Sequence, residues 1–87
     1  MTAMSQHDVV IYVRDKCSHC NELLSFFEAL NLPYELKNVS KSDTAKKELR
    51  QKNLYGTPVT FIDQEVFLGV PKKRIKQKLN IHSYYSF

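Results

Sequence analysis

Short hydrophobic runs along the chain predict alternating strands and helices. Val9–Val13 is apolar and β-branched between polar neighbours, which is typical of a strand covered on both faces. Directly after it, apolar residues recur at helical spacing and predict a helix over about residues 18–31. The face that this helix should bury consists of Cys20, Leu23, Leu24, Phe27 and Leu30.

A second strand and a second helix follow. Apolar and polar residues alternate over residues 34–39, as in a strand with one covered face. Ser40, with Asp43 three positions later, resembles a helix-capping signal, so we expect a helix over residues 41–52. This helix is mostly polar and should lie on the surface. Its expected core contacts are Ala45, Leu49 and Leu54.

The pattern of residues in the last third of the chain predicts a hairpin and a final helix. Val59–Ile62 and Glu65–Leu68 are separated by two turn-forming residues, which favours a tight hairpin. Gly69 should end the sheet, and Pro71 should open a helix that buries Ile75 and Leu79. The order β-α-β-α-β-β-α predicts an α/β fold whose first two strands are parallel and whose sheet is flanked by helices.

Length and composition indicate one globular domain. Of the 87 residues, 43% are hydrophobic and 25% are charged, which is ordinary for a soluble domain with a single core. We place this domain at residues 9–80, with residues 1–8 as a loose extension and residues 81–87 as a tail. Neither an apolar run of about 18 residues nor a secretory signal is present, so we expect a cytoplasmic protein without membrane contact.

The formal net charge is +4, and part of this excess lies in the expected last helix. A nucleic-acid site would need an aromatic stacking platform or a recognised binding module beside these cations. Neither is present, so we interpret the segment as a solvated helix face and expect no nucleic-acid partner. The cations concerned are Lys72, Lys73, Arg74, Lys76 and Lys78.

The two cysteines of the chain, Cys17 and Cys20, form a Cys-x-x-Cys pair. A disulfide between them closes too short a loop to stabilise the fold, so a catalytic or metal-binding role is favoured. Cys17 lies where a loop enters a helix, and the free N–H groups and dipole of that end stabilise a thiolate. Nearby positive groups should add to this effect: Arg14, Lys16 and His19.

Cys20 falls one turn further along, on the buried face of the helix. We therefore expect an exposed attacking thiol at Cys17 and a recessed resolving thiol at Cys20. Half of a four-ligand zinc site has the same spacing, but His7, His19 and His82 provide no second pair of ligands. We expect no metal site, although an iron-sulfur cluster shared with a second molecule stays open.

Two blocks of sequence resemble the glutaredoxin family. Residues 9–20 (VVIYVRDKCSHC) resemble its first strand and active-site loop, and residues 55–63 (YGTPVTFID) resemble its Thr-Pro loop and the strand that follows. The resemblance covers residues 9–79 and implies a thioredoxin fold with a mixed four-stranded sheet. It also implies that Pro58 is cis and that the backbone at Thr57 pairs with the substrate chain beside Cys17.

The resemblance further implies that Tyr12 and Arg14 contact glutathione, with Arg14 in place of the usual lysine. Gly69 and Val70 stand where glutathione-specific members have two glycines, and Lys72 stands where they have an acid. We therefore expect weak glutathione binding. This loop is more similar to that of glutaredoxin-like redoxins that serve ribonucleotide reductase and are recharged by thioredoxin reductase.

The expected function is that of a thiol-disulfide oxidoreductase and electron carrier. It would reduce protein disulfides or glutathione mixed disulfides through a Cys17-Cys20 cycle, as a monomer without a bound cofactor. Glutathione or thioredoxin reductase would supply the electrons, and ribonucleotide reductase is one candidate substrate. The alternatives are a metal-binding or iron-sulfur module that uses the same cysteines, and an interaction protein that docks through the basic helix and the aromatic tail, residues 84–87.

Overall fold

A computed structural model describes residues 8–79 of the chain. The extension and the aromatic tail expected from the sequence fall almost wholly outside these residues. Within them the element order is the predicted one. The elements are β1 (Val9–Val13), α1 (Ser18–Ala29), β2 (Glu35–Asn38), α2 (Asp43–Gln51), β3 (Val59–Ile62), β4 (Glu65–Leu68) and α3 (Lys72–Lys78).

The strands form one mixed sheet in the order β2-β1-β3-β4. β1 pairs in parallel with β2, with Ile11 opposite Leu36, and pairs antiparallel with β3. β3 and β4 form the predicted hairpin, in which Asp63 and Gln64 have φ values of 51° and 76°. Two successive positive φ angles are the signature of the tight turn that suits twisted strands.

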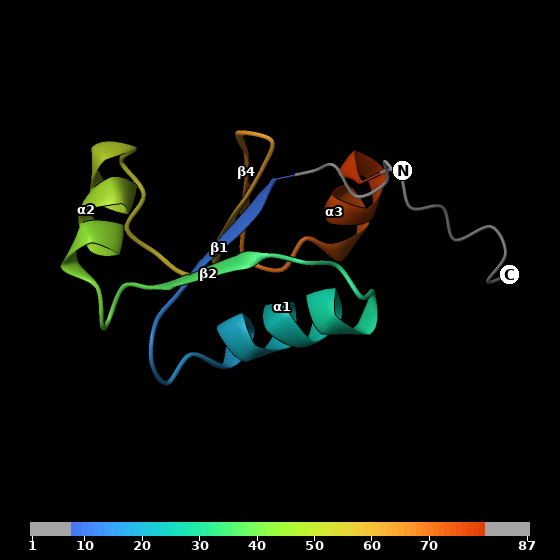
Figure 1. The fold of residues 1–87 in the computed structure, drawn as a ribbon, viewed down its shortest axis with the longest axis horizontal. Helices are drawn as coiled ribbons and strands as arrows, with labels where there is room; N and C mark the ends of the chain where they lie inside the picture. The colour runs from blue at the N-terminus through green and yellow to red at the C-terminus, as the bar shows by residue number, and fades with distance from the viewer. Residues whose placement is uncertain (1–7, 80–87) are drawn as a thin grey trace, which may run out of the picture.

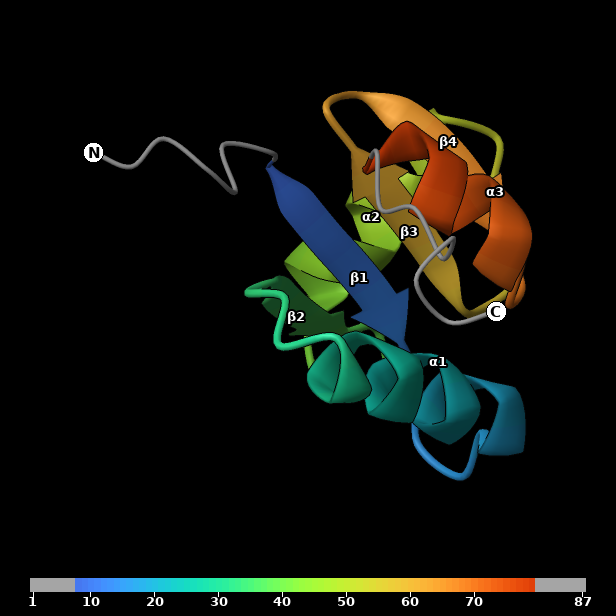
Figure 2. The same cartoon turned by 90° about the vertical axis from the view of Figure 1, so that its right-hand side faces the viewer.

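Helices cover both faces of the sheet. On one face, α1 and α3 bury Leu23, Phe27 and Ile75 against β1, β3 and β4. On the other face, α2 places Ala45 and Leu49 against Tyr12 and Val59. Figures 1 and 2 show α2 on the opposite side of the sheet from α1 and α3. No helix in the described part of the chain is both long and apolar enough to span a membrane.

The second helix begins later than predicted. Its cap is Ser42, whose hydroxyl accepts the N–H of Ala45 at 3.1 Å. The hydroxyl of Ser40 instead accepts the N–H of Asp15 at 3.0 Å. Ser40 therefore ties the end of β2 to the loop that precedes α1, which is a tertiary contact that local sequence cannot reveal.

The cations of α3 contact side chains of neighbouring elements. Lys72 lies 3.4 Å from Glu22 of α1, and Lys78 lies 3.3 Å from Glu65 of β4. The guanidinium of Arg74 stacks 5.0 Å from the ring centre of Phe67. Three of the five cations thus have a partner at the surface, and Lys72, Lys73 and Arg74 are exposed, as expected of a solvated helix face.

Candidate active site

Cys17 and Cys20 lie at the junction of β1 and α1, where they form a disulfide with 5.2 Å between their Cα atoms. Cys17 is the N-cap residue of α1, with extended backbone angles of −123° and 105°. Its sulfur accepts the N–H of Cys20 at 3.1 Å. The sulfur of Cys17 therefore occupies the position where a helix end best stabilises negative charge.

The burial of the two cysteines differs in the predicted order but is stronger than predicted. Cys20 is 1% exposed and Cys17 is 6% exposed. Both belong to the core cluster that contains Val13 and Leu23. The expectation of an exposed Cys17 was therefore wrong for the disulfide form, because the short loop folds this residue against the core.

A second loop, which precedes β3 and contains Thr57 and Pro58, lies beside the disulfide. The Thr57-Pro58 peptide bond is cis, as the resemblance implied, and the hydroxyl of Thr57 lies 4.0 Å from the sulfur of Cys17. The carbonyl of Pro58 accepts the N–H of Gly69 at 3.0 Å, and Val70 packs against the core cluster of the cysteines. The structure thus brings Thr57, Pro58, Gly69 and Val70 to one end of the sheet, next to Cys17.

A small cationic cleft lies beside Thr57. It has a volume of about 210 Å³ and is lined by Arg14 from the loop after β1 and by Lys46 and Arg50 from α2. None of the described residues that line it is acidic. Among the described residues, the guanidinium of Arg14 donates to the neighbouring carbonyl of Asp15, at 3.4 Å, and to no carboxylate. We call this hollow, with those three cations, the cationic cleft. In this cleft the guanidinium of Arg14 is placed to bind a carboxylate group of a ligand.

An apolar groove of about 380 Å³ lies on the other side of Thr57. Its walls include Leu54, Tyr55, Pro58 and Leu68, and we call it the apolar groove. Sequence reasoning missed Lys46, Arg50, Tyr55 and Leu68 as site residues. The available signal was the pair of cations four positions apart on α2 and the aromatic residue just before Gly56-Thr57-Pro58.

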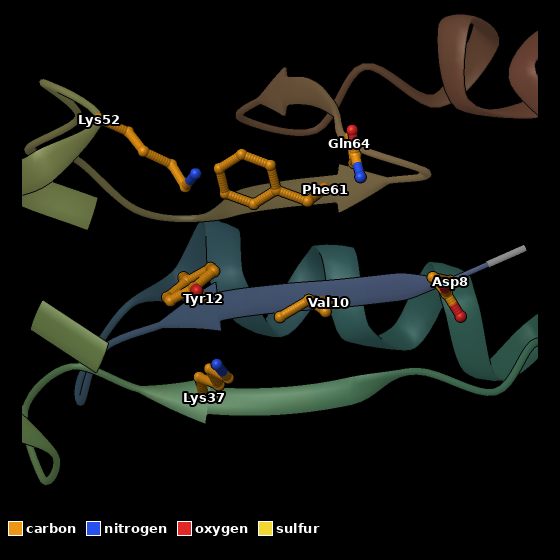
Figure 3. Close-up of a pocket in the computed structure, with 7 residues that line it drawn as sticks. All are labelled: Asp8, Val10, Tyr12, Lys37, Lys52, Phe61 and Gln64. Atoms are coloured by element: carbon orange, nitrogen blue, oxygen red, sulfur yellow. The ribbon is translucent and has the colours of Figure 1, made fainter. Parts of the chain in front are cut away.

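The structure does not bring Tyr12 to the disulfide. This residue faces α2, where its hydroxyl donates to Glu48 at 2.7 Å and its ring packs against Phe61. Figure 3 shows Tyr12 in a separate hollow of about 470 Å³, with Val10 and Phe61 from the same face of the sheet. Burial, together with the hydrogen bond to Glu48, raises the pKa of Tyr12. Its contact with glutathione stays a prediction.

Lys16 and His19 lie next to the cysteines but make no hydrogen bond or ion pair to them within the described residues. Lys16 has a φ of 55° in the loop, and His19 is exposed in the first turn of α1. Their influence on the Cys17 thiolate stays a prediction. Among residues 8–79, no cluster of three or more His, Cys, Asp or Glu side chains could hold a metal ion.

The chain is similar in sequence and fold to several known proteins. The family profile described as Glutaredoxin matches residues 9–67, which is more than half of the chain. A solved variant of the thioredoxin-like protein BC3987 is 30% identical, with a TM-score of 0.79, over 86% of this chain and 97% of that protein. No curated protein sequence gives a significant match.

Two further solved structures show the fold at lower identity. The glutaredoxin-like NrdH-redoxin from Escherichia coli is 23% identical, with a TM-score of 0.74, over 80% of this chain and 92% of that protein. Thioredoxin from Fasciola hepatica is 17% identical, with a TM-score of 0.65, over 91% of this chain and 83% of that protein. The chain therefore has the thioredoxin fold that the resemblance implied.

Proposed function

The chain belongs to the glutaredoxin family, and on that premise we propose that it is a thiol-disulfide oxidoreductase that reduces disulfides in protein substrates. Cys17 is the attacking thiol and Cys20 is the resolving thiol. The observation that supports this most strongly is the sulfur of Cys17 at the N-cap of α1, 3.1 Å from the N–H of Cys20 and beside Thr57. A helix end of this kind lowers the pKa of a thiol and provides the nucleophile at neutral pH.

The reaction has two exchanges. The Cys17 thiolate attacks one sulfur of the substrate disulfide, so that a bond forms between Cys17 and that sulfur while the other substrate sulfur leaves as a thiolate. Cys20 then loses its proton and attacks the sulfur of Cys17. This second attack releases the remaining substrate thiolate and leaves the Cys17-Cys20 disulfide. The substrate gains the two electrons that the protein loses. Its two thiolates take up the proton released by Cys20 and one proton from solvent, which replaces the proton that Cys17 gave to solvent on ionising.

The electron donor that returns the pair to the dithiol is either glutathione or thioredoxin reductase. Lys72 bridges to Glu22 and lies over Phe26, with 5.9 Å from its ammonium nitrogen to the ring centre. An acid that would bind the ammonium group of glutathione is therefore missing from this position, and Val70 fills the place of a glycine. The E. coli neighbour is described as having a thioredoxin-like activity profile. Both observations favour thioredoxin reductase, and ribonucleotide reductase is a candidate substrate.

Reduction of a small disulfide with each electron source tests the proposal. The purified protein is given hydroxyethyl disulfide with glutathione and glutathione reductase, and separately with thioredoxin reductase, while NADPH consumption is followed. We expect turnover with thioredoxin reductase and slower turnover with glutathione. Cys17→Ser is the control and should abolish both activities. No turnover with either source, by a protein that carries two titratable thiols, would contradict the proposed function.

A further inference from the structure

The cationic cleft and the apolar groove share three residues, namely Leu54, Tyr55 and Thr57. Tyr55 is 75% exposed, which makes it the most exposed of the large hydrophobic residues in the described chain. Thr57 is the shared residue that also approaches the sulfur of Cys17, at 4.0 Å. The two hollows therefore flank one point, and that point is where a substrate disulfide must meet Cys17.

The cations of the cleft are not compensated within residues 8–79. Lys37, Lys72 and Lys78 each form an ion pair, whereas Arg14, Lys46 and Arg50 form none with another described residue. Lys46 and Arg50 are four positions apart on α2, and like charges at this spacing destabilise a helix. Arg14 adds a third positive charge from the end of β1. This arrangement costs folding energy and suits a ligand that carries negative charge.

The apolar groove has the opposite character. Leu68, at the end of β4, is 58% exposed and lines the groove with Leu54 and Pro58. No charged side chain lines it. An apolar side chain placed there would remove Leu68 and Tyr55 from water, which favours binding.

From this juxtaposition we infer that the preferred substrates are extended protein segments whose reacting cysteine is flanked by an acidic side chain on one side and an apolar side chain on the other. Lys46, Arg50 and Tyr55 are the residues that set this preference. The inference rests on the proposed function, because it concerns which disulfides Cys17 attacks.

An extended chain whose cysteine lies next to Thr57 passes both hollows, because Thr57 lines each of them. A strand advances about 3.3 Å per residue, so side chains within two residues of a cysteine next to Thr57 reach roughly 7 Å to either side. Glutathione offers carboxylates for the cationic cleft but has no apolar side chain for the groove. A protein segment fills both hollows, which favours protein disulfides over glutathione disulfide at this site.

Short peptides joined as symmetrical disulfides test the inference. The parent peptide carries two glutamates on one side of its cysteine and a leucine on the other, and it is made in both orders. In one variant peptide lysines replace the glutamates, and in another serine replaces the leucine. The reduced protein is mixed with each peptide, and the second-order rate of peptide thiol release is measured. For whichever of the two orders reacts faster, we expect the parent peptide to react about tenfold faster than the lysine peptide at low ionic strength. This ratio of rates should be smaller in high salt.

Matched protein variants assign the preference to the cleft. Lys46→Gln with Arg50→Gln should bring the glutamate and lysine peptides to nearly equal rates. Lys73→Gln with Lys76→Gln removes the same charge from α3, on the opposite face of the sheet, and should preserve the preference. Tyr55→Ser should reduce the advantage of leucine over serine. Equal rates for all peptides with the unmodified protein would overturn the inference while leaving the function intact, whereas no reaction with any peptide would count against the function itself.

Discussion

Thr60 places a hydroxyl group in a fully buried position at the centre of the sheet. It lies on β3 between Ile11 and Phe67 of the neighbouring strands and is 0% exposed. Its hydroxyl oxygen has no hydrogen-bond partner among the described residues. A buried hydroxyl without a partner costs about 1 to 3 kcal/mol, because the bond it makes to water in the unfolded chain is lost.

Thr60→Val should therefore stabilise the protein by about 1 kcal/mol, since valine keeps the shape and removes the polar group. The measurement is the free energy of unfolding from denaturant titration of the reduced protein. Thr44→Val, on the exposed surface of α2, is the control and should change it little. Destabilisation by Thr60→Val would show that the hydroxyl has a partner in solution.

Three elements meet at the carboxylate of Glu48. Its oxygen accepts hydrogen bonds from Tyr12 of β1 at 2.7 Å and from Lys37 of β2 at 2.9 Å. The hydrogen bond from Lys37, followed by that from Tyr12, lowers the pKa of Glu48. The same bond raises the pKa of Lys37. Glu48 therefore joins α2 to the parallel strand pair.

This contact predicts a dependence of stability on pH. Because the pKa of Glu48 is lowered in the folded state, its contribution is present above the unfolded value of about 4.3 and is lost as the pH falls through the folded value. Glu48→Gln should destabilise the protein at pH 7 by no more than about 1 kcal/mol, since the pair is partly exposed and screened. The difference from the unmodified protein should shrink at pH 3. Glu35→Gln, on β2 two positions before Lys37, should show a smaller change at both pH values. A constant Glu48→Gln effect between pH 7 and pH 3 would contradict this role.

The contact between α1 and α3 leads to a prediction about glutathione. Val70→Gly with Lys72→Asp should introduce a glycine and an acid between β4 and the first turn of α3, where glutathione-specific relatives have them, and should lower the KM for glutathione several-fold. Because Lys72 pairs with Glu22, the new aspartate would face a carboxylate, so Glu22→Gln is added to remove the repulsion. Val70→Gly with Lys73→Asp and Glu22→Gln carries the same charge change one residue away and is the control. Equal KM values for the two combinations would show that position 72 does not determine glutathione affinity.

The sequence predicts the elements well where local patterns decide them. β3 and β4 have the predicted bounds because a two-residue turn separates two short apolar runs. The start of α2 was misplaced because Ser40 and Ser42 are equally good caps locally, and only the contact of Ser40 with Asp15 distinguishes them. The alternation of apolar and polar residues over residues 34–39 predicted that Leu36 would be covered. Leu36 is 48% exposed, however, because β2 is an edge strand.

At the scale of the whole molecule, the cysteines could be predicted from sequence and their surroundings could not. Cys-x-x-Cys before a helix is a local signal, and the cis bond before Pro58 followed from the family resemblance. The cationic cleft joins Arg14 to Lys46 and Arg50, more than thirty positions away, only because α2 packs on the face of the sheet that contains Tyr12, near the end of β1. Such a site depends on topology, which no local pattern contains.

The direct test of the account is to identify the cysteine that bonds to substrate. Cys20→Ser and Cys17→Ser are each reduced, mixed with a disulfide-containing protein substrate and quenched with acid, and mass spectrometry locates the intermolecular disulfide. Cys20→Ser should accumulate a mixed disulfide at Cys17, because the attack proceeds and the resolving thiol is missing. Cys17→Ser should form little or none. Mixed disulfides that form equally fast at Cys20 in Cys17→Ser would contradict the assignment of Cys17 as the attacking thiol.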